Sequence, residues 1–325
     1  MHKRDFLKLL AAPLGATAWG GAFAQSDFPS RQIEFVIPLP PGGPTDAAPR
    51  IALSRMGPGF RVPLVALNKP GAGGGIAAEY VAKSKPDGHT ILATSNATLS
   101  VRTAIERALP YAIGDFTAIG MYASDVGIIA ARRGEPFTSL DTLVDYARNN
   151  PGKLSYASAG VGSVSHISAE LFKLAYNVAI VHVPFPGSGP ARTAVLGGHV
   201  PLVTGAYSAF AGLFTSGELV PLVTTASRRL AALPNVPTMT ERGFADATLN
   251  IWMGFFAPSA TPPAIVDTLS KSLLAVAQDP GMRAALEKSW MVLDYRDGAA
   301  TREQLLKEHN AVLKAAERID FKTTT

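Results

Sequence analysis

Short runs rich in Val, Ile and Leu recur along the chain, and segments with helical periodicity separate them. This alternation constrains the fold most, because strands that alternate with helices predict βαβ units and a mainly parallel sheet. The expected fold class is therefore α/β. We expect strands at residues 33–39, 62–67, 89–94, 117–122, 126–131, 154–157, 180–184, 200–204, 219–224, 251–257 and 291–295.

Three helix starts carry recognisable caps. Thr138 or Ser139 is expected to cap a helix that ends before Pro151. Asp279 precedes a proline at the first helical position. Thr301 begins a Thr-x-x-Gln capping box, which predicts the start of a C-terminal helix.

The chain is long enough for two domains with separate cores, since it has 325 residues and single cores stop growing at about 250–300 residues. Its residues are 47% hydrophobic and 17% charged, which is too apolar for a disordered protein. No apolar run approaches the roughly 20 residues that a membrane span needs. We therefore expect two α/β lobes joined by direct crossings of the chain, with residues 233–237 near the return crossing.

The first 24 residues have the pattern of an export signal. A basic start, an apolar stretch and Ala22-Phe23-Ala24 predict cleavage after Ala24, whereas a short buried N-terminal helix is the alternative. Export by the general secretory route and by the twin-arginine route both stay open, since Lys3 stands where the first arginine belongs. The chain has no cysteine, so neither a disulfide nor a lipid anchor is expected. A freely diffusing periplasmic monomer is the expectation.

Charge argues against nucleic acid as a partner. The formal net charge is +5 with the first 24 residues included. This mild excess forms no Lys/Arg cluster and no aromatic stripe of the kind that nucleic-acid-binding proteins carry.

The first of two similar loops, residues 39–46, follows an apolar strand and opens a helix. Backbone N–H groups at a helix start favour an anion, because the helix dipole is positive there. Pro49 is tolerated only in the first turn, so we expect Asp46 to be the N-cap. Gly42, Gly43, Thr45 and Asp46 are the candidate ligand contacts, and a plain strand-to-helix turn is the alternative.

The second loop, residues 158–166, has the same arrangement more than a hundred residues later. Its hydroxyl and N–H groups could hold a carboxylate without an arginine, because a carboxylate accepts several hydrogen bonds. We expect this loop to carry most of the recognition, so that replacing Ser163 weakens binding more than replacing Thr45. The candidate contacts in this loop are Ser158, Gly160, Gly162, Ser163 and, at one remove, His166.

Two further segments are weaker candidates. The glycine cluster at residues 71–75 contains GxGxxA, but no acidic residue ends a second strand about 20 residues on, as a dinucleotide site requires. A long turn that lets a helix pack on the sheet is the simpler interpretation. Ser95 and Asn96 follow a strand of the same expected sheet edge as the first loop and are candidate ligand contacts.

Signatures of catalysis are sparse. The sequence has no GxSxG elbow and no P-loop, and its six histidines have no zinc-ligand spacing, so we expect no metal and no cofactor. Ser163 and His166 could form a nucleophile and a base, but no orienting acid is evident.

With these loops, the chain resembles the solute receptors of tripartite tricarboxylate transporters, the Bug family, over residues 27–320. Several motifs occur in the same order as in that family. They are Phe28-Pro29-Ser30, Pro40-Pro41-Gly42-Gly43-x-Thr45-Asp46, Lys85-Pro86-Asp87-Gly88, Leu233-Pro234-Asn235-Val236-Pro237-Thr238 and the stretches 68–74, 150–158 and 181–190.

The resemblance implies a type II periplasmic binding fold, whose two α/β lobes close on a ligand. Lobe 1 would comprise residues 25–125 and 227–325, and lobe 2 residues 126–226. In such receptors the two loops hold a carboxylate of the ligand. The segment with Phe185, Ser188 and Gly189, together with Tyr207 after the strand at 200–204, would shape the distal end of the pocket.

This sequence departs from the family pattern at the distal end. Pro186 replaces a frequent lysine, and Pro201 and Gly205 stand where aspartates are common, while Pro44 removes a donor from the first loop. Phe185, Tyr207 and Phe210 are expected near that end, so the far end of the ligand is expected to be apolar or aromatic.

The expected function is that of a non-enzymatic receptor that delivers an organic carboxylate to the membrane permease subunits of a tripartite tricarboxylate transporter. A sensor for a signalling kinase is the first alternative. A periplasmic hydrolase that uses Ser163 is the second.

Overall fold

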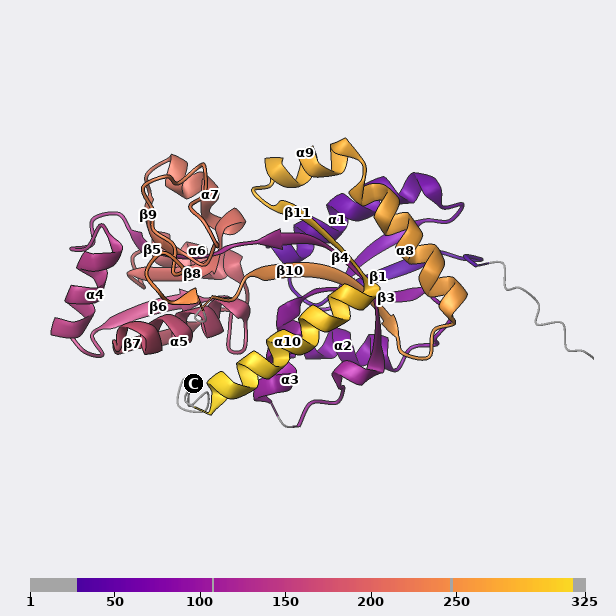
Figure 1. Ribbon diagram of the computed structural model, residues 1–325, viewed down its shortest axis with the longest axis horizontal. Coiled ribbons are helices and arrows are strands. Elements are labelled where there is room, and N and C mark those ends of the chain that lie inside the picture. The colour runs from indigo at the N-terminus through magenta and orange to yellow at the C-terminus, as the bar shows by residue number, and fades with distance from the viewer. Residues whose placement is uncertain (1–27, 107, 246–247, 318–325) are drawn as a thin grey trace, which may run out of the picture.

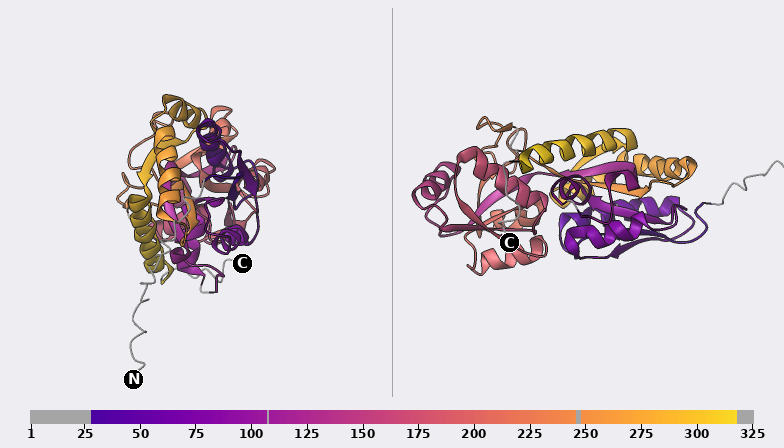
Figure 2. Two further views of the ribbon diagram at one scale, coloured as in Figure 1. Left: turned by 90° about the vertical axis from the view of Figure 1, so that its right-hand side faces the viewer. Right: turned by 90° about the horizontal axis from the view of Figure 1, so that it is seen from below.

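The computed structural model describes residues 28–106, 108–245 and 248–317, which form two α/β lobes, each built on its own sheet (Figure 1). The lobes lie next to each other along the long axis of the molecule (Figure 2). This confirms the expected two-lobe fold class. The expected export signal, residues 1–24, lies outside the described residues.

Lobe 1 contains a six-stranded sheet with the order β11-β4-β10-β3-β1-β2. Its strands are β1 (Ile33–Ile37), β2 (Leu64–Asn68), β3 (Thr90–Ser95), β4 (Phe116–Asp125), β10 (Ile251–Pro258) and β11 (Val292–Asp297). Successive side chains of a strand point to opposite faces, so Phe35 and Phe255 meet on one face with ring centroids 4.8 Å apart, while Val36 and Phe256 pack on the other.

Helices cover both faces of this sheet. The helices of lobe 1 are α1 (Pro44–Met56), α2 (Gly75–Ala82), α3 (Arg102–Ile105), α8 (Pro263–Ala277), α9 (Pro280–Lys288) and α10 (Gly298–Ala316). Buried residues of α1, α8 and α9 pack on the face of Phe35, and α2 packs on the face of Val36. Short helical turns lie at Gly57–Gly59, Ala72–Gly74, Ala97–Val101 and Ile113–Asp115.

Lobe 2 contains a five-stranded sheet with the order β7-β6-β8-β5-β9. Its elements are β5 (Gly127–Arg132), α4 (Leu140–Asn149), β6 (Leu154–Ser158), α5 (Val164–Tyr176), β7 (Ile180–Pro184), α6 (Ser188–Leu196), β8 (Leu202–Ala206), α7 (Tyr207–Thr215) and β9 (Leu219–Thr224). The helices α4 and α5 cover one face of the sheet, and α6 and α7 cover the other.

Every strand expected from the sequence is present, with ends shifted by a few residues, but the expectation of mainly parallel sheets is wrong. In lobe 1 β10 runs antiparallel to β3 and β4, and in lobe 2 β5 runs antiparallel to β8 and β9. The reason is the double crossing. The chain leaves lobe 1 through β4 and returns through β10, so two neighbouring strands at the crossing must run in opposite directions.

The helix caps agree in part with the expectations. Ser139 caps α4 by accepting a hydrogen bond from the Thr142 N–H, and Asp279 caps α9, which begins at a proline. However, α10 begins at Gly298, three residues before the expected capping box. Thr301 is buried inside the helix, where its hydroxyl accepts a hydrogen bond from the Met121 N–H at 2.9 Å.

The return segment between β9 and β10 packs on lobe 2 for much of its length. Met239 belongs to the core of lobe 2, and its N–H donates to the Thr224 carbonyl at 2.9 Å. Residues 227–244 were expected in lobe 1. We propose instead that the second crossing lies close to residue 250, where β10 begins.

The first crossing is held by a buried carboxylate. Asp125 is the last residue of β4, and its oxygens accept from the Ser208 N–H of α7 in lobe 2 at 3.3 and 3.4 Å. Next to it, the Tyr207 N–H donates to the Val126 carbonyl at 2.9 Å. Burial raises the pKa of Asp125 to about 7, although the Ser208 hydrogen bonds lower it. Asp125 therefore ties the end of a lobe 1 strand to a lobe 2 helix.

Asp125→Asn should change how stability depends on pH. The pKa of Asp125 is about 7 in the folded state and 3.8 in the unfolded chain. The contribution of protonated Asp125 to the free energy of unfolding is therefore fully present below pH 3.8 and is lost as the pH rises through 7. The free energy of unfolding of the wild type, relative to Asp125→Asn, should fall by a few kcal/mol between pH 4 and 7 and then level off. Urea unfolding at each pH measures this, with exposed Asp145→Asn as control. A pH-independent difference would contradict it.

Candidate ligand-binding site

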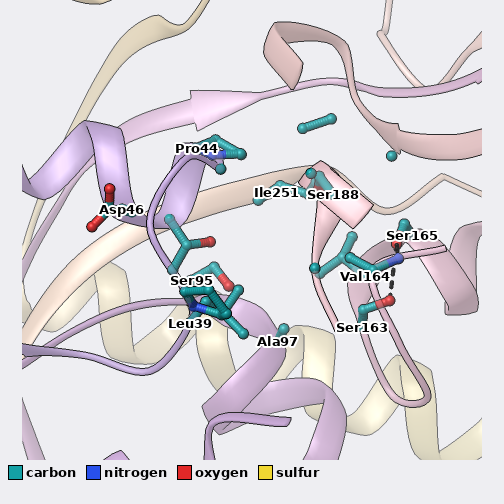
Figure 3. A pocket seen from close by; sticks show the side chains of 18 of the residues that line it. Leu39, Pro44, Asp46, Ser95, Ala97, Ser163, Val164, Ser165, Ser188 and Ile251 are labelled. Atoms are coloured by element: carbon teal, nitrogen blue, oxygen red, sulfur yellow. Dashed lines mark hydrogen bonds between the residues drawn. The ribbon is translucent and has the colours of Figure 1, made fainter. Parts of the chain in front are cut away.

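A cleft between the two lobes is lined by loops from both sheets (Figure 3). Its empty space, with the open mouth included, is about 640 Å³, of which only about 70 Å³ can be occupied by the centres of water-sized spheres. The residues that line it are Leu39, Pro40, Pro41, Gly43, Pro44, Thr45, Asp46, Ser95, Ala97, Ala159, Ser163, Val164, Ser165, Pro186, Gly187, Ser188, Gly189, Pro190, Gly205, Ala206 and Ile251.

Several helices begin at this cleft. The first residues of α1, α5 and α6 are Pro44, Val164 and Ser188, and Ala206 is the N-cap of α7. The positive ends of these helix dipoles converge on the cleft from both lobes. Among the described residues that line it, none is a lysine, an arginine or a histidine. The favourable potential for an anion therefore comes from backbone dipoles.

The first loop is arranged differently from the expectation. The helix begins at Pro44 with Gly43 as N-cap, so Asp46 lies in the first turn and Pro49 lies inside the helix. A proline at the first helical position is favourable because its missing N–H has no partner there in any case. The Asp46 and Ala47 N–H groups both donate to the Gly43 carbonyl. Gly43 and Thr45 line the cleft, and helix geometry leaves their N–H groups without an intrahelical acceptor.

Asp46 is committed to the loop itself. Its carboxylate accepts from the Arg50 Nε and the Asn68 Nδ2, both at 2.9 Å, and from the Gly42 N–H at 3.3 Å. Figure 3 shows Asp46 apart from the other labelled side chains of the cleft. Asp46 thus fixes the first loop, and Gly42 is not available to a ligand.

The second loop is also bonded mainly to itself. Ser163 caps α5, and its hydroxyl lies 2.7 Å from the Gly160 carbonyl and 2.9 Å from the Ser165 hydroxyl. Ser158 contacts His182, and the Gly160 N–H donates to the Ser158 hydroxyl at 3.1 Å. These bonds differ from the expectation that the serines of this loop bind ligand directly. Helix geometry leaves the N–H groups of Val164 and Ser165 without an intrahelical acceptor.

Three hydroxyls on the cleft are uncommitted. Within the described residues, the side chains of Thr45, Ser95 and Ser188 make no hydrogen bond. Thr45 is 5% exposed and Ser95 is 4% exposed, so both are nearly enclosed by the cleft. They are the side chains best placed to donate to a bound anion.

The structure brings seven of the expected site residues to the cleft, namely Gly43, Thr45, Asp46, Ser95, Ser163, Ser188 and Gly189. The other eight lie outside its lining, namely Gly42, Asn96, Ser158, Gly160, Gly162, His166, Phe185 and Tyr207.

Asn96 has a structural role. Its amide donates to the Asn250 carbonyl and to the buried Glu308 carboxylate, both at 3.0 Å. Glu308 also accepts from the Trp252 indole at 2.8 Å. Asn96 therefore joins β3 to β10 and α10, and it does not face the cleft.

The distal end of the cleft is apolar but not aromatic. Tyr207 and Phe210 are buried residues of α7 and lie outside the cleft lining, which includes Pro186, Gly205 and Ile251. Tyr207 instead meets Trp290 of lobe 1 edge-on, with ring centroids 5.8 Å apart. None of the aromatic side chains expected at this end therefore lines the cleft within the described residues.

The lining residues that the sequence did not single out are mostly small and apolar. Ala97 follows Ser95, and Ile251 opens β10. An antiparallel strand starts at the edge where its parallel neighbours end. The direction of β10 could have identified Ile251, but the sequence pattern predicted a parallel strand.

Ser163 and His166 do not form a nucleophile and base pair. The His166 ring is buried, and its Nδ1 accepts from the Gly162 N–H at 3.2 Å. Burial, followed by the Lys173 ammonium, lowers the pKa of His166 to about 4. Among the described residues there is also no cluster of three His, Asp or Glu side chains that could hold a metal ion.

The glycine cluster at 71–75 lies outside the cleft lining and accommodates a neighbouring arginine. A Cβ on Gly73 would lie 2.2 Å from the Arg102 Nη1, and Gly73 has a φ of +53°. Gly73 therefore leaves room for the Arg102 side chain of α3, a contact that the sequence interpretation, a turn that lets a helix pack on the sheet, did not include.

Gly205→Ala should destabilise lobe 2 and deform the cleft. A Cβ at position 205 would lie 2.5 Å from Cε2 of the buried Phe210 ring. Overpacking of this kind costs about 1–3 kcal/mol in the free energy of unfolding. Urea unfolding measures the loss.

The matched control is Gly212→Ala in α7, where a Cβ would meet nothing within 4 Å. Alanine is favoured over glycine inside a helix by about 0.5–1 kcal/mol, so this variant should be as stable as the wild type or more so. Equal stability of the two variants would show that the Phe210 contact is unimportant.

Comparison with known proteins gives consistent relatives. The model of the tripartite tricarboxylate transporter family receptor matches residues 52–315. Protein BugT of Bordetella pertussis is 33% identical over 261 residues, which cover 79% of this chain and 80% of BugT. A UPF0065 protein of Pseudomonas sp. is 33% identical over 262 residues, which cover 80% of this chain and 78% of that protein.

Solved structures of similar proteins share the fold. Rpa4515 of R. palustris with adipate has a TM-score of 0.85 at 29% identity, covering 90% of this chain and 98% of that one. MatC of Rhodopseudomonas palustris with bound malate has a TM-score of 0.82 at 29% identity, covering 88% and 99%. The periplasmic binding protein BugD has a TM-score of 0.83 at 29% identity, covering 90% and 98%.

Proposed function

The chain belongs to the tripartite tricarboxylate transporter receptor family, and we propose that it captures a small organic carboxylate in the periplasm and delivers it to the membrane permease of such a transporter. Members of this family are solute receptors, not enzymes, and this chain is one of them. Within the described residues no helix is long and apolar enough to cross a membrane.

The convergence of helix N-termini on a cleft without cationic side chains is the observation that supports this proposal. Backbone N–H groups and the free hydroxyls of Thr45, Ser95 and Ser188 are suitable donors to one carboxylate. The relatives with adipate and with malate are consistent with a ligand of this class.

The lining of the cleft favours a ligand whose far end is apolar. The lining includes Leu39, Ala97, Val164, Ile251 and several prolines, and Asp46 is its only charged member in the part of the chain that the structure describes. A second carboxylate or an ammonium group would lose its hydration there without gaining a charged partner. An aliphatic or aromatic monocarboxylate meets this condition better than citrate or aspartate.

Delivery requires the ligand to favour the closed arrangement of the lobes. A ligand that contacts both lobes stabilises the closed state, because it makes its full set of contacts only there. We propose that the permease reads the surface formed on closure.

The test of this function is thermal unfolding of the purified protein with hexanoate, benzoate, citrate and aspartate. A ligand at about 100 times its Kd adds roughly 2.7 kcal/mol to the free energy of unfolding, which raises the Tm measurably. We expect hexanoate or benzoate to raise the Tm more than citrate or aspartate. Stronger stabilisation by citrate or aspartate would contradict the apolar end, and no shift with any of the acids would contradict carboxylate binding.

Thr45→Ala and Ser95→Ala should each weaken carboxylate binding. A hydrogen bond to a charged group contributes about 1.5–3 kcal/mol, so the Kd should rise roughly ten- to a hundredfold in each variant. Calorimetric titration with the best acid of the panel measures this. Thr268→Ala, on the exposed surface of α8, is the matched control and should bind as the wild type does. An unchanged Kd in both site variants would exclude these hydroxyls as ligand donors.

A further inference from the structure

Three stacked rings lie beneath the second loop. The ring of His182 on β7 stacks between Tyr156 of β6 and His166 of α5, with centroid distances of 4.9 Å and 4.1 Å. All three side chains are buried, and none of them lines the cleft. The proposed function uses none of these rings directly.

Two of the rings hold backbone groups of the loop. His166 Nδ1 accepts from the Gly162 N–H at 3.2 Å. His182 Nε2 lies 2.6 Å from the Ser158 hydroxyl, and that hydroxyl accepts from the Gly160 N–H at 3.1 Å. Each histidine therefore fixes one glycine of the loop, directly in one case and through a serine in the other.

These two glycines determine the path of the loop. Gly160 and Gly162 have φ values of +118° and +73°, a region that other residues rarely adopt. Between Ala159 and Ser165 the chain must turn so that Ala159, Ser163, Val164 and Ser165 reach the cleft. A glycine can adopt many other conformations, so the bonds from the two histidines select this one.

We propose that His166 and His182 are positioning residues, which act as hydrogen-bond acceptors to hold the second loop in the conformation that presents its N–H groups to the ligand. Their role for the ligand rests on the proposed function. They touch no ligand themselves.

To accept these hydrogen bonds, each imidazole must carry no proton on the nitrogen that faces the loop, which is Nδ1 of His166 and Nε2 of His182. A proton on His166 Nδ1 would point at the Gly162 N–H and prevent that hydrogen bond. If both histidines were protonated, their positively charged rings, stacked at 4.1 Å, would repel each other. Among the described residues, the charged and titratable groups nearby include Glu170 and Lys173 on α5, which pair at 2.8 Å, and Tyr156, whose hydroxyl donates to Glu170 at 2.7 Å. From lobe 1, Arg102 and Glu106 approach Gly162.

This environment keeps His166 neutral. Burial, with the Lys173 ammonium as a second cause, lowers the pKa of His166 to about 4. The ion pair of Lys173 with Glu170 makes the surroundings nearly balanced in charge. The hydrogen bond from the Gly162 N–H to His166 should therefore persist over the pH range above 5.

Hydrogen exchange of the Gly162 amide tests the proposal without any ligand. His166→Leu removes the acceptor and should speed exchange about tenfold, whereas His166→Asn retains an acceptor oxygen and should stay within about threefold of the wild type. The exposed His199→Leu on lobe 2 is the control.

In the wild type, protection of the Gly162 amide, corrected for intrinsic exchange rates, should be constant from pH 8 to 5 and fall near pH 4. In His166→Asn it should not fall.

The same comparison applies to His182. His182→Gln retains a polar group near the Nε2 position, and His182→Leu does not, so only His182→Leu should lose protection of the Gly160 amide. Equal protection of Gly160 and Gly162 in the Leu variants and the wild type would overturn the proposal. Equal loss in the Leu variants and in their Asn or Gln counterparts would overturn it too, because packing alone would then explain the effect.

Titration with hexanoate links the loop to binding. Each Leu variant should raise the Kd about tenfold or more, and the Asn and Gln variants should restore most of the affinity. If the wild type binds neither hexanoate nor the other acids of the panel, the proposed function fails, while the exchange data still decide the role of the histidines. If the acids bind and the Leu variants bind equally well, the positioning role in binding fails.

Discussion

The positive ends of helix dipoles, directed from both lobes into one cleft without a cationic side chain, are the electrostatic constraint on which the rest of the structure depends. A dipole end supplies only about half an elementary charge, and its effect decays within a turn. The donors must therefore be held close to the ligand. This explains why both loops carry many internal hydrogen bonds and why the uncommitted hydroxyls are so few.

The two loops achieve rigidity by different means. In the first loop the Asp46 carboxylate, bonded to Arg50 and Asn68, fixes the turn before α1. In the second loop neutral groups do the same, through the Ser163 cap and the buried histidines. Each lobe thus presents a preformed half of the site. In the proposed function, lobe closure would only have to bring the halves together, so little conformational entropy would be lost within the loops on binding.

The strands and the location of the two loops could be predicted from sequence, because both depend on local patterns of apolar residues and glycines. The direction of β10 could not, since it follows from the double crossing between lobes. Asn96 and Tyr207 illustrate a second limit. Each has a side chain suited to a ligand, but a contact with a residue far away in the sequence holds it outside the cleft lining. Asn96 donates to Glu308, and Tyr207 packs against Trp290. Asp46 lines the cleft but is not the expected N-cap, and its hydrogen bonds depend on Asn68 in β2.

The contact of Trp290 with Tyr207 joins the lobes at the surface of the molecule. The indole is 44% exposed and belongs to lobe 1, whereas the phenol belongs to lobe 2. In the proposed function the lobes separate to release the ligand, and separation at this contact would expose more of an indole that is already partly in water. The emission of Trp290 would then report on the opening of the lobes.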